Sequence, residues 1–259
     1  MATTLRRCGR LIGLTGALSC ALGEYAVVGW WRRGADRARY QARWSHRHAQ
    51  RIARVLHLRV NLIGRWHATP LIAANHLGYL DIVTLAAVAP VRFVAKAEVR
   101  GWPVFGRLAQ CAGTIFLARS DRRRLVEVNR ALRGVLATGG GFVVFPEATS
   151  SDGQRVLPFR SSLLAVAAEE PHAVLPVGLR YAVDDGDAAR EVCWWGDMTL
   201  VPHLWRLLGF REIRVTVCVG CPVWHWDRKE LAAQLHQAVT DLTHPATEGL
   251  REPALAASV

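Results

Sequence analysis

The chain has 259 residues, of which 51% are apolar, so it is long enough to bury a core and fits one large α/β domain or two small ones. Its net charge of +12 indicates an anionic partner and leaves nucleic acid, anionic lipid and acidic substrates open, while its ten tryptophans favour a membrane surface. Only Cys218 and Cys221 of the six cysteines lie close together, and no second pair suggests a metal site.

The N-terminal segment 11–31 is apolar with a single charge, Glu24, and three interpretations compete. A signal peptide is disfavoured, because the apolar character resumes after Ser19 and continues to Trp30 and Trp31. A spanning helix has just enough residues, but Glu24 and four glycines weaken it, since a carboxylate near the bilayer centre is costly. The third interpretation is a helix embedded in one leaflet. The tryptophan pair, followed by two arginines, marks an interfacial end in either membrane case, so we predict membrane attachment and leave its depth open.

The next segment, 35–57, is basic and compatible with a helix. Its arginines drift slowly along one helical face, at positions 39, 43, 47, 51 and 54. Such a helix suits an anionic lipid surface, and the alternative is a solvated helix flank. Because an apolar segment adjoins it, the lipid interpretation is favoured, and we predict residues 1–57 to be a membrane-associated helical region.

Beyond residue 57, short apolar runs alternate with helical periods. The predicted strands cover residues 58–63, 71–74, 91–95, 114–118, 142–145, 173–181 and 211–219. The predicted helices cover residues 81–88, 103–111, 121–137, 161–170, 201–208 and 228–242. This alternation predicts an α/β domain over residues 58–243, with a mixed, largely parallel sheet flanked by helices. Residues 244–259 are predicted to form a flexible tail.

A polar corner follows the predicted strand 71–74, and it contains His76 and, five residues later, Asp81. A histidine is readily poised as a general base near neutral pH, and a carboxylate bonded to its other ring nitrogen fixes the tautomer. On an ideal helix these two positions point about 140° apart, so they meet only if the chain between them is not regular helix. Gly78 permits such a turn. The alternative is a helix cap or a surface hydrogen bond.

Other predicted strands also end in polar residues. Lys96 follows the strand 91–95, Arg119 follows the strand 114–118, and a hydroxyl-rich turn, 145–153, follows the strand 142–145. Each alone is compatible with a solvated position or an ordinary turn. Functional residues of such sheets gather where strands end, so together they predict a base and two cations at one edge, suited to an anionic substrate with a hydroxyl to be deprotonated.

Two of these blocks resemble motifs of the glycerolipid acyltransferases, the family that contains 1-acylglycerol-3-phosphate acyltransferase. Asn75 and His76 with Asp81 resemble the H-x4-D motif, and the run Phe145-Pro146-Glu147-Ala148-Thr149 is similar to the F-P-E-G-T block.

Two further blocks continue the resemblance in the same order. Residues 93–119, with Lys96 and Arg119, look like the second block of the family, and residues 174–177 are similar to its fourth, proline-containing block. Order and spacing hold over about residues 60–180. The later segment 195–204 is similar to bacterial members, including those that acylate lyso-ornithine lipid.

The resemblance implies direct acyl transfer at a membrane. His76 would deprotonate the hydroxyl of a lysolipid, with Asp81 orienting the imidazole, and the oxygen would attack an acyl thioester carried by acyl carrier protein (acyl-ACP) or coenzyme A (acyl-CoA). The first expected acceptor is 1-acylglycerol-3-phosphate, giving phosphatidic acid. The expected location is the cytoplasmic face of a bacterial inner membrane. No metal or organic cofactor is expected, and no nucleic acid. The residues implied to bind substrate are Asn75, Lys96, Arg119, Glu147, Ala148, Thr149 and Ser150.

Two positions depart from the family pattern. Ala148 stands where the family usually has glycine, and at a positive φ an alanine costs on the order of 1 kcal/mol or more. Ser150 stands where many phosphate-acceptor members carry an arginine, so one expected phosphate ligand is missing. Either Arg119, Arg155 or Arg160 compensates, or the acceptor has another head group, such as that of lyso-ornithine lipid.

Two rival functions come from other classes. In one, the fold binds or remodels lipid without turnover, which the intact His76 and Asp81 argue against. In the other, the charge of +12 serves nucleic acid, which requires aromatic residues interleaved with basic ones. The basic residues instead crowd beside an apolar N-terminal segment, so the lipid interpretation is preferred.

Overall fold

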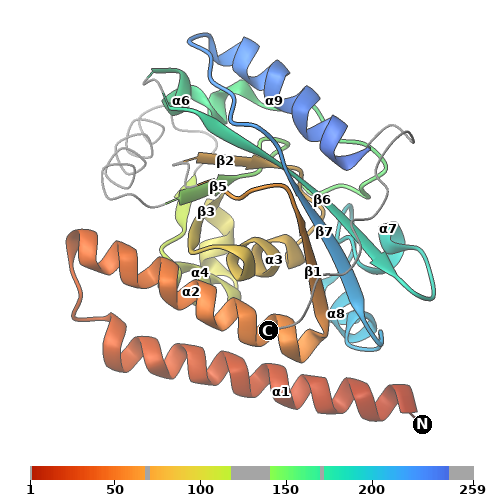
Figure 1. The fold of residues 1–259 in the computed structure, drawn as a ribbon. Helices are drawn as coiled ribbons and strands as arrows, with labels where there is room; N and C mark the ends of the chain where they lie inside the picture. The colour runs from red at the N-terminus through yellow and green to blue at the C-terminus, as the bar shows by residue number, and fades with distance from the viewer. Residues whose placement is uncertain (1, 68–70, 118–140, 170–171, 245–259) are drawn as a thin grey trace.

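The computed structural model describes residues 2–67, 71–117, 141–169 and 172–244. Its N-terminal part is a helical hairpin (Figure 1). Helix α1 (Ala2–Glu24) continues through a π-helical turn, η1 (Tyr25–Gly29), and α2 (Gly34–Leu56) runs back along it. Helix α2 packs in turn on α3 (Leu80–Val88), so that α1 forms the outermost layer on this side of the molecule.

A polar cluster centred on Glu24 holds the hairpin together. The Glu24 carboxylate contacts Nε2 of His48 at 3.0 Å, pairs with Arg47 and accepts a hydrogen bond from the hydroxyl of Tyr40 at 3.3 Å. Next to this cluster the Nε1 of Trp44 donates to the backbone carbonyl of Ala21. The one charge in the apolar segment is therefore paired within the protein.

Seven strands among the described residues form one sheet in the order β1-β7-β6-β2-β5-β3-β4. Their bounds are β1 Leu58–Ile63, β2 Leu71–Ala74, β3 Val91–Lys96, β4 Ile115–Leu117, β5 Gly141–Val144, β6 Val174–Val183 and β7 Ile213–Val219. All neighbours pair in parallel except β6 and β7, which are antiparallel. The predicted mixed, largely parallel sheet is confirmed.

The remaining helices flank the sheet. Their bounds are η2 Ala97–Gly101, α4 Phe105–Cys111, η3 Ser161–Leu163, α6 Ala165–Glu169, α7 Ala188–Glu191, α8 Leu200–Leu207 and α9 Arg228–Thr243. The predicted helix 161–170 is wrong as a single element, because it divides into η3 and the short α6. The predicted helix 121–137 and the tail from 245 onward lie outside the described residues.

The central strands are buried on both faces because their side chains alternate. Leu71 and Ala73 of β2 belong to the core cluster that includes α6 and α9, while Ile72 and Ala74 belong to the larger cluster that includes α2, α3 and α8. All four are at most 3% exposed. The C-terminal end of β2 is therefore rigidly placed, and the polar corner begins directly after it.

Candidate active site

The corner after β2 is an irregular turn, which is why two residues five apart can meet. Residues 75–78 have no regular secondary structure, Gly78 has φ +153°, and α3 begins only at Leu80. A Cβ on Gly78 would lie 3.0 Å from the backbone nitrogen of Trp194, so the turn also requires glycine for close packing. Nδ1 of His76 lies 2.8 Å from Oδ2 of Asp81. The expected departure from regular helix is confirmed.

Asp81 is fully buried, and several donors stabilise its charge. Besides His76, its Oδ2 accepts the backbone N–H groups of Leu77 at 2.6 Å and Gly78 at 3.0 Å, while Oδ1 accepts the hydroxyl of Tyr181 at 2.9 Å. A carboxylate held in this way keeps the imidazole proton on Nδ1 and leaves Nε2 as the basic nitrogen. The imidazole is 23% exposed, so Nε2 can meet a substrate.

Tyr181, in β6, is a supporting residue that sequence reasoning missed. Burial and the charge of Asp81 raise the pKa of Tyr181 well above its ordinary value, so the hydroxyl stays protonated and donates to the carboxylate. The same hydroxyl lies 3.0 Å from Oγ1 of Thr84. The sequence did offer one signal: near the end of an apolar strand, packing alone does not require a tyrosine, so its hydroxyl suggests a hydrogen-bonding role.

Glu147 fixes the backbone of His76 from the neighbouring strand end. It is 3% exposed, and its two oxygens accept the backbone N–H groups of His76 at 2.7 Å and of Leu157 at 2.9 Å. Burial raises the pKa of Glu147 to about 7, although the two backbone hydrogen bonds oppose this. The backbone N–H of Ser151 donates to the carbonyl of His76 at 2.9 Å, so the loop after β5 holds both polar groups of the histidine backbone.

The ring plane of His76 is set by stacking. The rings of His76 and Phe145 have centroids 4.1 Å apart and planes 17° apart, and Phe93 lies beyond Phe145 at 6.4 Å. Because the ring is held by Asp81 at one nitrogen and by Phe145 across its face, the direction of Nε2 is fixed before substrate arrives.

The other predicted site residues fall into three groups. Asn75 is buried and exchanges two hydrogen bonds with the backbone of Leu179, which ties β2 to β6. Lys96 is exposed at the end of β3, on the strand next to β5. The third group lies in the loop after β5. Ala148 has φ +59°, the left-handed conformation in which an alanine is strained. Thr149 is exposed, and Ser150 is partly exposed. Arg119 lies outside the described residues. Substrate binding by these residues stays a prediction.

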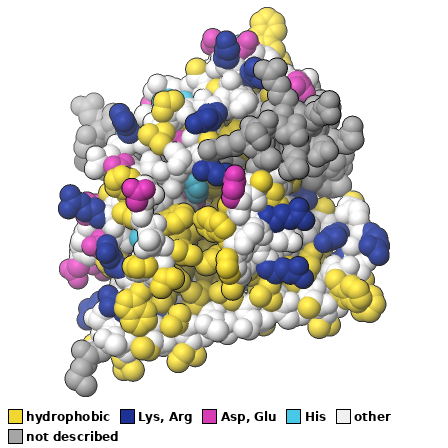
Figure 2. All heavy atoms as spheres, turned by 180° about the vertical axis from the view of Figure 1, so that it is seen from behind, with side chains coloured by type: hydrophobic (Ala, Val, Ile, Leu, Met, Phe, Trp, Pro, Cys, Tyr) yellow, Lys and Arg dark blue, Asp and Glu magenta, His cyan; other side chains and the backbone are white. Residues whose placement is uncertain are grey.

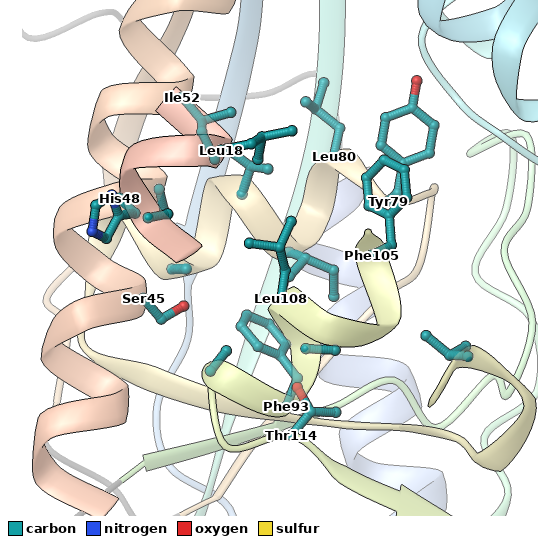
Figure 3. A pocket seen from close by; sticks show the side chains of 18 of the residues that line it. Leu18, Ser45, His48, Ile52, Tyr79, Leu80, Phe93, Phe105, Leu108 and Thr114 are labelled. Carbon is teal, nitrogen blue, oxygen red and sulfur yellow. The ribbon is translucent and has the colours of Figure 1, made fainter. Parts of the chain in front are cut away.

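An apolar cavity of about 250 Å³ lies beside the turn that carries His76. Tyr79 and Leu80, which follow His76 by three and four residues, line it together with Phe93, Trp102 and side chains of α1, α2, α4 and α8. Figure 3 shows Leu18, Ser45 and Ile52 on one side of this space and Tyr79, Phe105 and Leu108 on the other. Hydrophobic side chains also gather in the middle of the face in Figure 2, with Lys and Arg side chains near them. The cavity offers an apolar chain a place next to the base.

Trp194, before α8, and His203, within α8, both contact the turn that carries His76. The backbone N–H of Trp194 donates to the carbonyl of Leu77 at 2.7 Å, and the hydroxyl of Tyr79 lies 2.8 Å from Nδ1 of His203. The indole of Trp194 meets the edge of Trp102 with a centroid distance of 6.1 Å. These contacts connect Trp194 and His203 to the turn that carries His76. The segment 195–204, which is similar to bacterial acyltransferases, begins directly after Trp194 and contains His203. No group of three His, Cys, Asp or Glu side chains within the described parts of the chain could hold a metal ion.

This chain is similar in sequence to known proteins. A family model described as Acyltransferase matches residues 59–180. The lyso-ornithine lipid O-acyltransferase of Brucella abortus is 36% identical over 219 residues, covering 78% of this chain and 82% of its own. The 1-acyl-sn-glycerol-3-phosphate acyltransferase of Neisseria gonorrhoeae is 36% identical over 172 residues, covering 65% and 67%.

The fold has a match among solved structures. The crystal structure of the 1-acyl-sn-glycerophosphate acyltransferase from Thermotoga maritima superimposes with a TM-score of 0.66 at 21% identity, covering 95% of this chain and all of that one. The sequence relatives and the family model, which spans both the His76 corner and the Glu147 loop, show that this chain belongs to the acyltransferase family and is an acyltransferase.

Proposed function

We propose that this protein moves a fatty acyl group from an acyl thioester to the free hydroxyl of a lysolipid. The observation that carries the proposal is the His76–Asp81 pair, in which the carboxylate is hidden and the imidazole is accessible beside an apolar cavity. Such a pair makes Nε2 a general base, and the cavity accommodates an acyl chain whose reacting carbonyl lies at the histidine.

The chemistry is a direct transfer. Nε2 of His76 takes the proton of the acceptor hydroxyl as its oxygen bonds to the thioester carbonyl carbon. The carbon–sulfur bond then breaks, and the imidazolium returns its proton to the departing thiolate. Cys193, the buried cysteine next to the turn, is a poor nucleophile, because burial raises its pKa to about 12. This supports a path without a covalent acyl-enzyme.

Two acceptors are proposed. The resemblance of the motifs puts 1-acylglycerol-3-phosphate first. Lyso-ornithine lipid is the second candidate, because Ser150 replaces an arginine expected for phosphate and because the Brucella relative of that name is matched over more of its length than the Neisseria one. The proposed donors are acyl-ACP and acyl-CoA.

We further propose that α1 lies in one leaflet of the membrane, at the cytoplasmic face of the inner membrane. Residues Ala2–Gly29 are long and apolar enough to cross a bilayer, and apolar side chains such as Leu5, Ile12 and Val27 are exposed along them. Trp30 and Trp31, directly after this range, are exposed as well. However, α2 follows α1 and carries the catalytic domain alongside it (Figure 1). A spanning α1 would draw that domain into the hydrocarbon, whereas an in-plane α1 leaves it in water.

The proposal is tested by thiol release from acyl-CoA and acyl-ACP with detergent-purified protein. Lysophosphatidic acid and lyso-ornithine lipid are offered separately, and the acylated product is identified by mass spectrometry. We expect release that depends on one acceptor and falls by a factor of roughly a hundred or more in a folded His76→Ala variant. A folded wild-type protein that releases no thiol with either acceptor would favour the non-catalytic lipid-binding alternative.

A further inference from the structure

A second cavity, of about 320 Å³, lies where the first turns of α1 meet the loop between α8 and β7. It is polar, unlike the cavity beside His76, and both basic and acidic side chains line it. The basic ones include Arg6, Arg7 and Arg211. It belongs neither to the catalytic turn nor to the apolar cavity, since the two cavities share no lining residue.

Arg10 anchors this end of α1 to the catalytic domain. It is 7% exposed, and its guanidinium donates to the backbone carbonyls of Leu208 at 3.3 Å, of Arg211 at 2.8 Å and of Phe210. Three hydrogen bonds to one loop fix the helix start, so the neighbouring side chains Arg6 and Arg7 are held at the cavity wall in advance of any ligand.

The side chains of Arg6 and Arg7 are partly buried but lack an ion-pair partner among the described residues. Within the described residues neither forms an ion pair with a carboxylate, and the Nε atoms of both are buried without a hydrogen-bond partner. The Arg7 guanidinium stacks 5.5 Å from the ring centroid of Trp205. A Cβ on Gly209 would lie only 2.8 Å from Nε of Arg7, so that glycine makes room for the guanidinium.

Three of the four carboxylates on the wall of this cavity pair with other arginines, and the fourth is Asp185. Glu191 pairs with Arg206 at 3.7 Å, and Asp184 and Glu212 both pair with Arg214, which is not part of the cavity wall. Within the described residues, this leaves three wall arginines without an ion pair, Arg6, Arg7 and Arg211, against one carboxylate, Asp185. Positive charge therefore remains to be neutralised, and an anion bound between Arg6 and Arg7 would relieve their mutual repulsion.

We propose that this cavity binds the phosphate of a membrane phospholipid head group. The same helix turns expose Leu5 and Ile12, at 77% and 74%, so the acyl chains of a lipid whose phosphate meets Arg6 and Arg7 would run along the outer face of α1. The planar guanidinium of arginine can donate two parallel hydrogen bonds to phosphate oxygens. A lipid would also cover Leu5 and Ile12 with its acyl chains, whereas a free phosphate ion would leave these side chains in water. The inference rests on the proposed attachment of α1 to lipid, and not on the acyl-transfer reaction.

The test is native mass spectrometry of the delipidated full-length protein in neutral detergent, titrated with phosphatidylglycerol or with a diacylglycerol of the same chains. The double variant Arg6→Gln/Arg7→Gln is compared with Arg228→Gln/Lys229→Gln, which removes the same charge from exposed positions of α9, outside the predicted membrane-associated region. We expect the first variant to weaken phosphatidylglycerol binding at least tenfold, the control to bind like wild type, and diacylglycerol to show no such difference.

Three results would overturn the proposal. Equal weakening in both double variants would mean that only net charge matters, and unchanged binding in the Arg6/Arg7 variant would place the lipid elsewhere. Inorganic phosphate that competes as well as the lipid would assign the cavity to a free anion. Thiol release measured on the same samples separates this question from the proposed function, because a protein inactive in transfer can still show the site-dependent binding.

Discussion

The protein contains two histidine–carboxylate contacts of nearly the same length, and they are built in opposite ways. In the first, His76 and Asp81 lie 2.8 Å apart, the carboxylate is fully buried and the imidazole is 23% exposed. In the second, His48 and Glu24 lie 3.0 Å apart, the imidazole is 4% exposed and the carboxylate 25%. The first pair offers a basic nitrogen to a ligand, whereas the second hides its nitrogen between two helices.

The partners of each carboxylate explain the difference. Asp81 receives backbone N–H groups and the Tyr181 hydroxyl, all neutral donors that orient it without competing for the imidazole. Glu24 is shared with the charged Arg47, so the contact with His48 is one part of a clamp between α1 and α2. A short distance alone does not mark a candidate base; the exposure of the imidazole separates the two pairs.

The largest expected effect comes from Asp81→Asn. The amide cannot hold the Nδ1 proton, so the imidazole adopts the other tautomer and Nε2 stops being a base. We expect kcat to fall roughly a thousandfold. The matched change in the second pair, Glu24→Gln, should leave kcat within about threefold, which the thiol-release assay measures. Comparable losses in both variants would abolish the distinction between the pairs.

Tyr181→Phe should have a smaller effect on the catalytic pair. It removes one donor from a buried carboxylate, a contact worth about 1.5–3 kcal/mol, while preserving the aromatic ring. We expect kcat to drop about tenfold with KM nearly unchanged, because the hydroxyl acts through Asp81 and not on substrate. Thr84→Val removes the other partner of that hydroxyl and serves as the control, for which a drop of less than threefold is expected. A raised KM in Tyr181→Phe would contradict a positioning role.

The pH dependence of stability tests Glu147. Its folded-state pKa of about 7 exceeds the ordinary 4.5, so between these values the folded protein binds a proton that the unfolded chain does not. The free energy of unfolding of wild type, relative to Glu147→Gln, should therefore rise as the pH falls from about 8 to about 5, by up to about 3 kcal/mol. Denaturation by urea at several pH values measures this. A relative stability that falls would show that the two backbone donors outweigh burial.

The smallest expected effect is that of Ala148→Gly in the loop that supports His76. Glycine relieves the left-handed strain at φ +59°, and greater freedom of the unfolded chain offsets part of that gain. We expect a net stabilisation of about 0.5 kcal/mol, seen as a Tm increase of about 1–2 °C. The reverse change at Gly153, which has φ +79° and a neighbouring Leu77 side chain 3.0 Å from the added Cβ, should lower Tm.

Sequence reasoning predicted the seven strands of the described sheet. β1 and β2 match their predicted bounds, and the others differ at their ends by at most two residues. Apolar runs between turn residues are local signals, and the strands that they predict are formed in the fold. The pairing of His76 with Asp81 was also predictable, because both lie in one short turn with a glycine. The hydrogen bonds from Tyr181 to Asp81 and from Leu157 to Glu147 were not predictable, because they join segments far apart in the sequence and so leave no pattern in residue spacing. The sequence identified Glu147 only as part of a family motif. It did not predict that the carboxylate would accept two backbone N–H groups.

The order of strands in the sheet has a consequence for how the chain is made. Leu58 of β1 pairs with Ile213 of β7, so β1 has no partner strand until most of the chain has left the ribosome. The α1–α2 hairpin, by contrast, needs only its own first 56 residues for the contacts of Glu24. Local helical contacts form long before distant strands can pair. The α1–α2 hairpin is thus able to form while the sheet is still incomplete, so the proposed attachment of α1 to lipid would precede completion of the sheet, and the enzyme would finish folding beside the membrane.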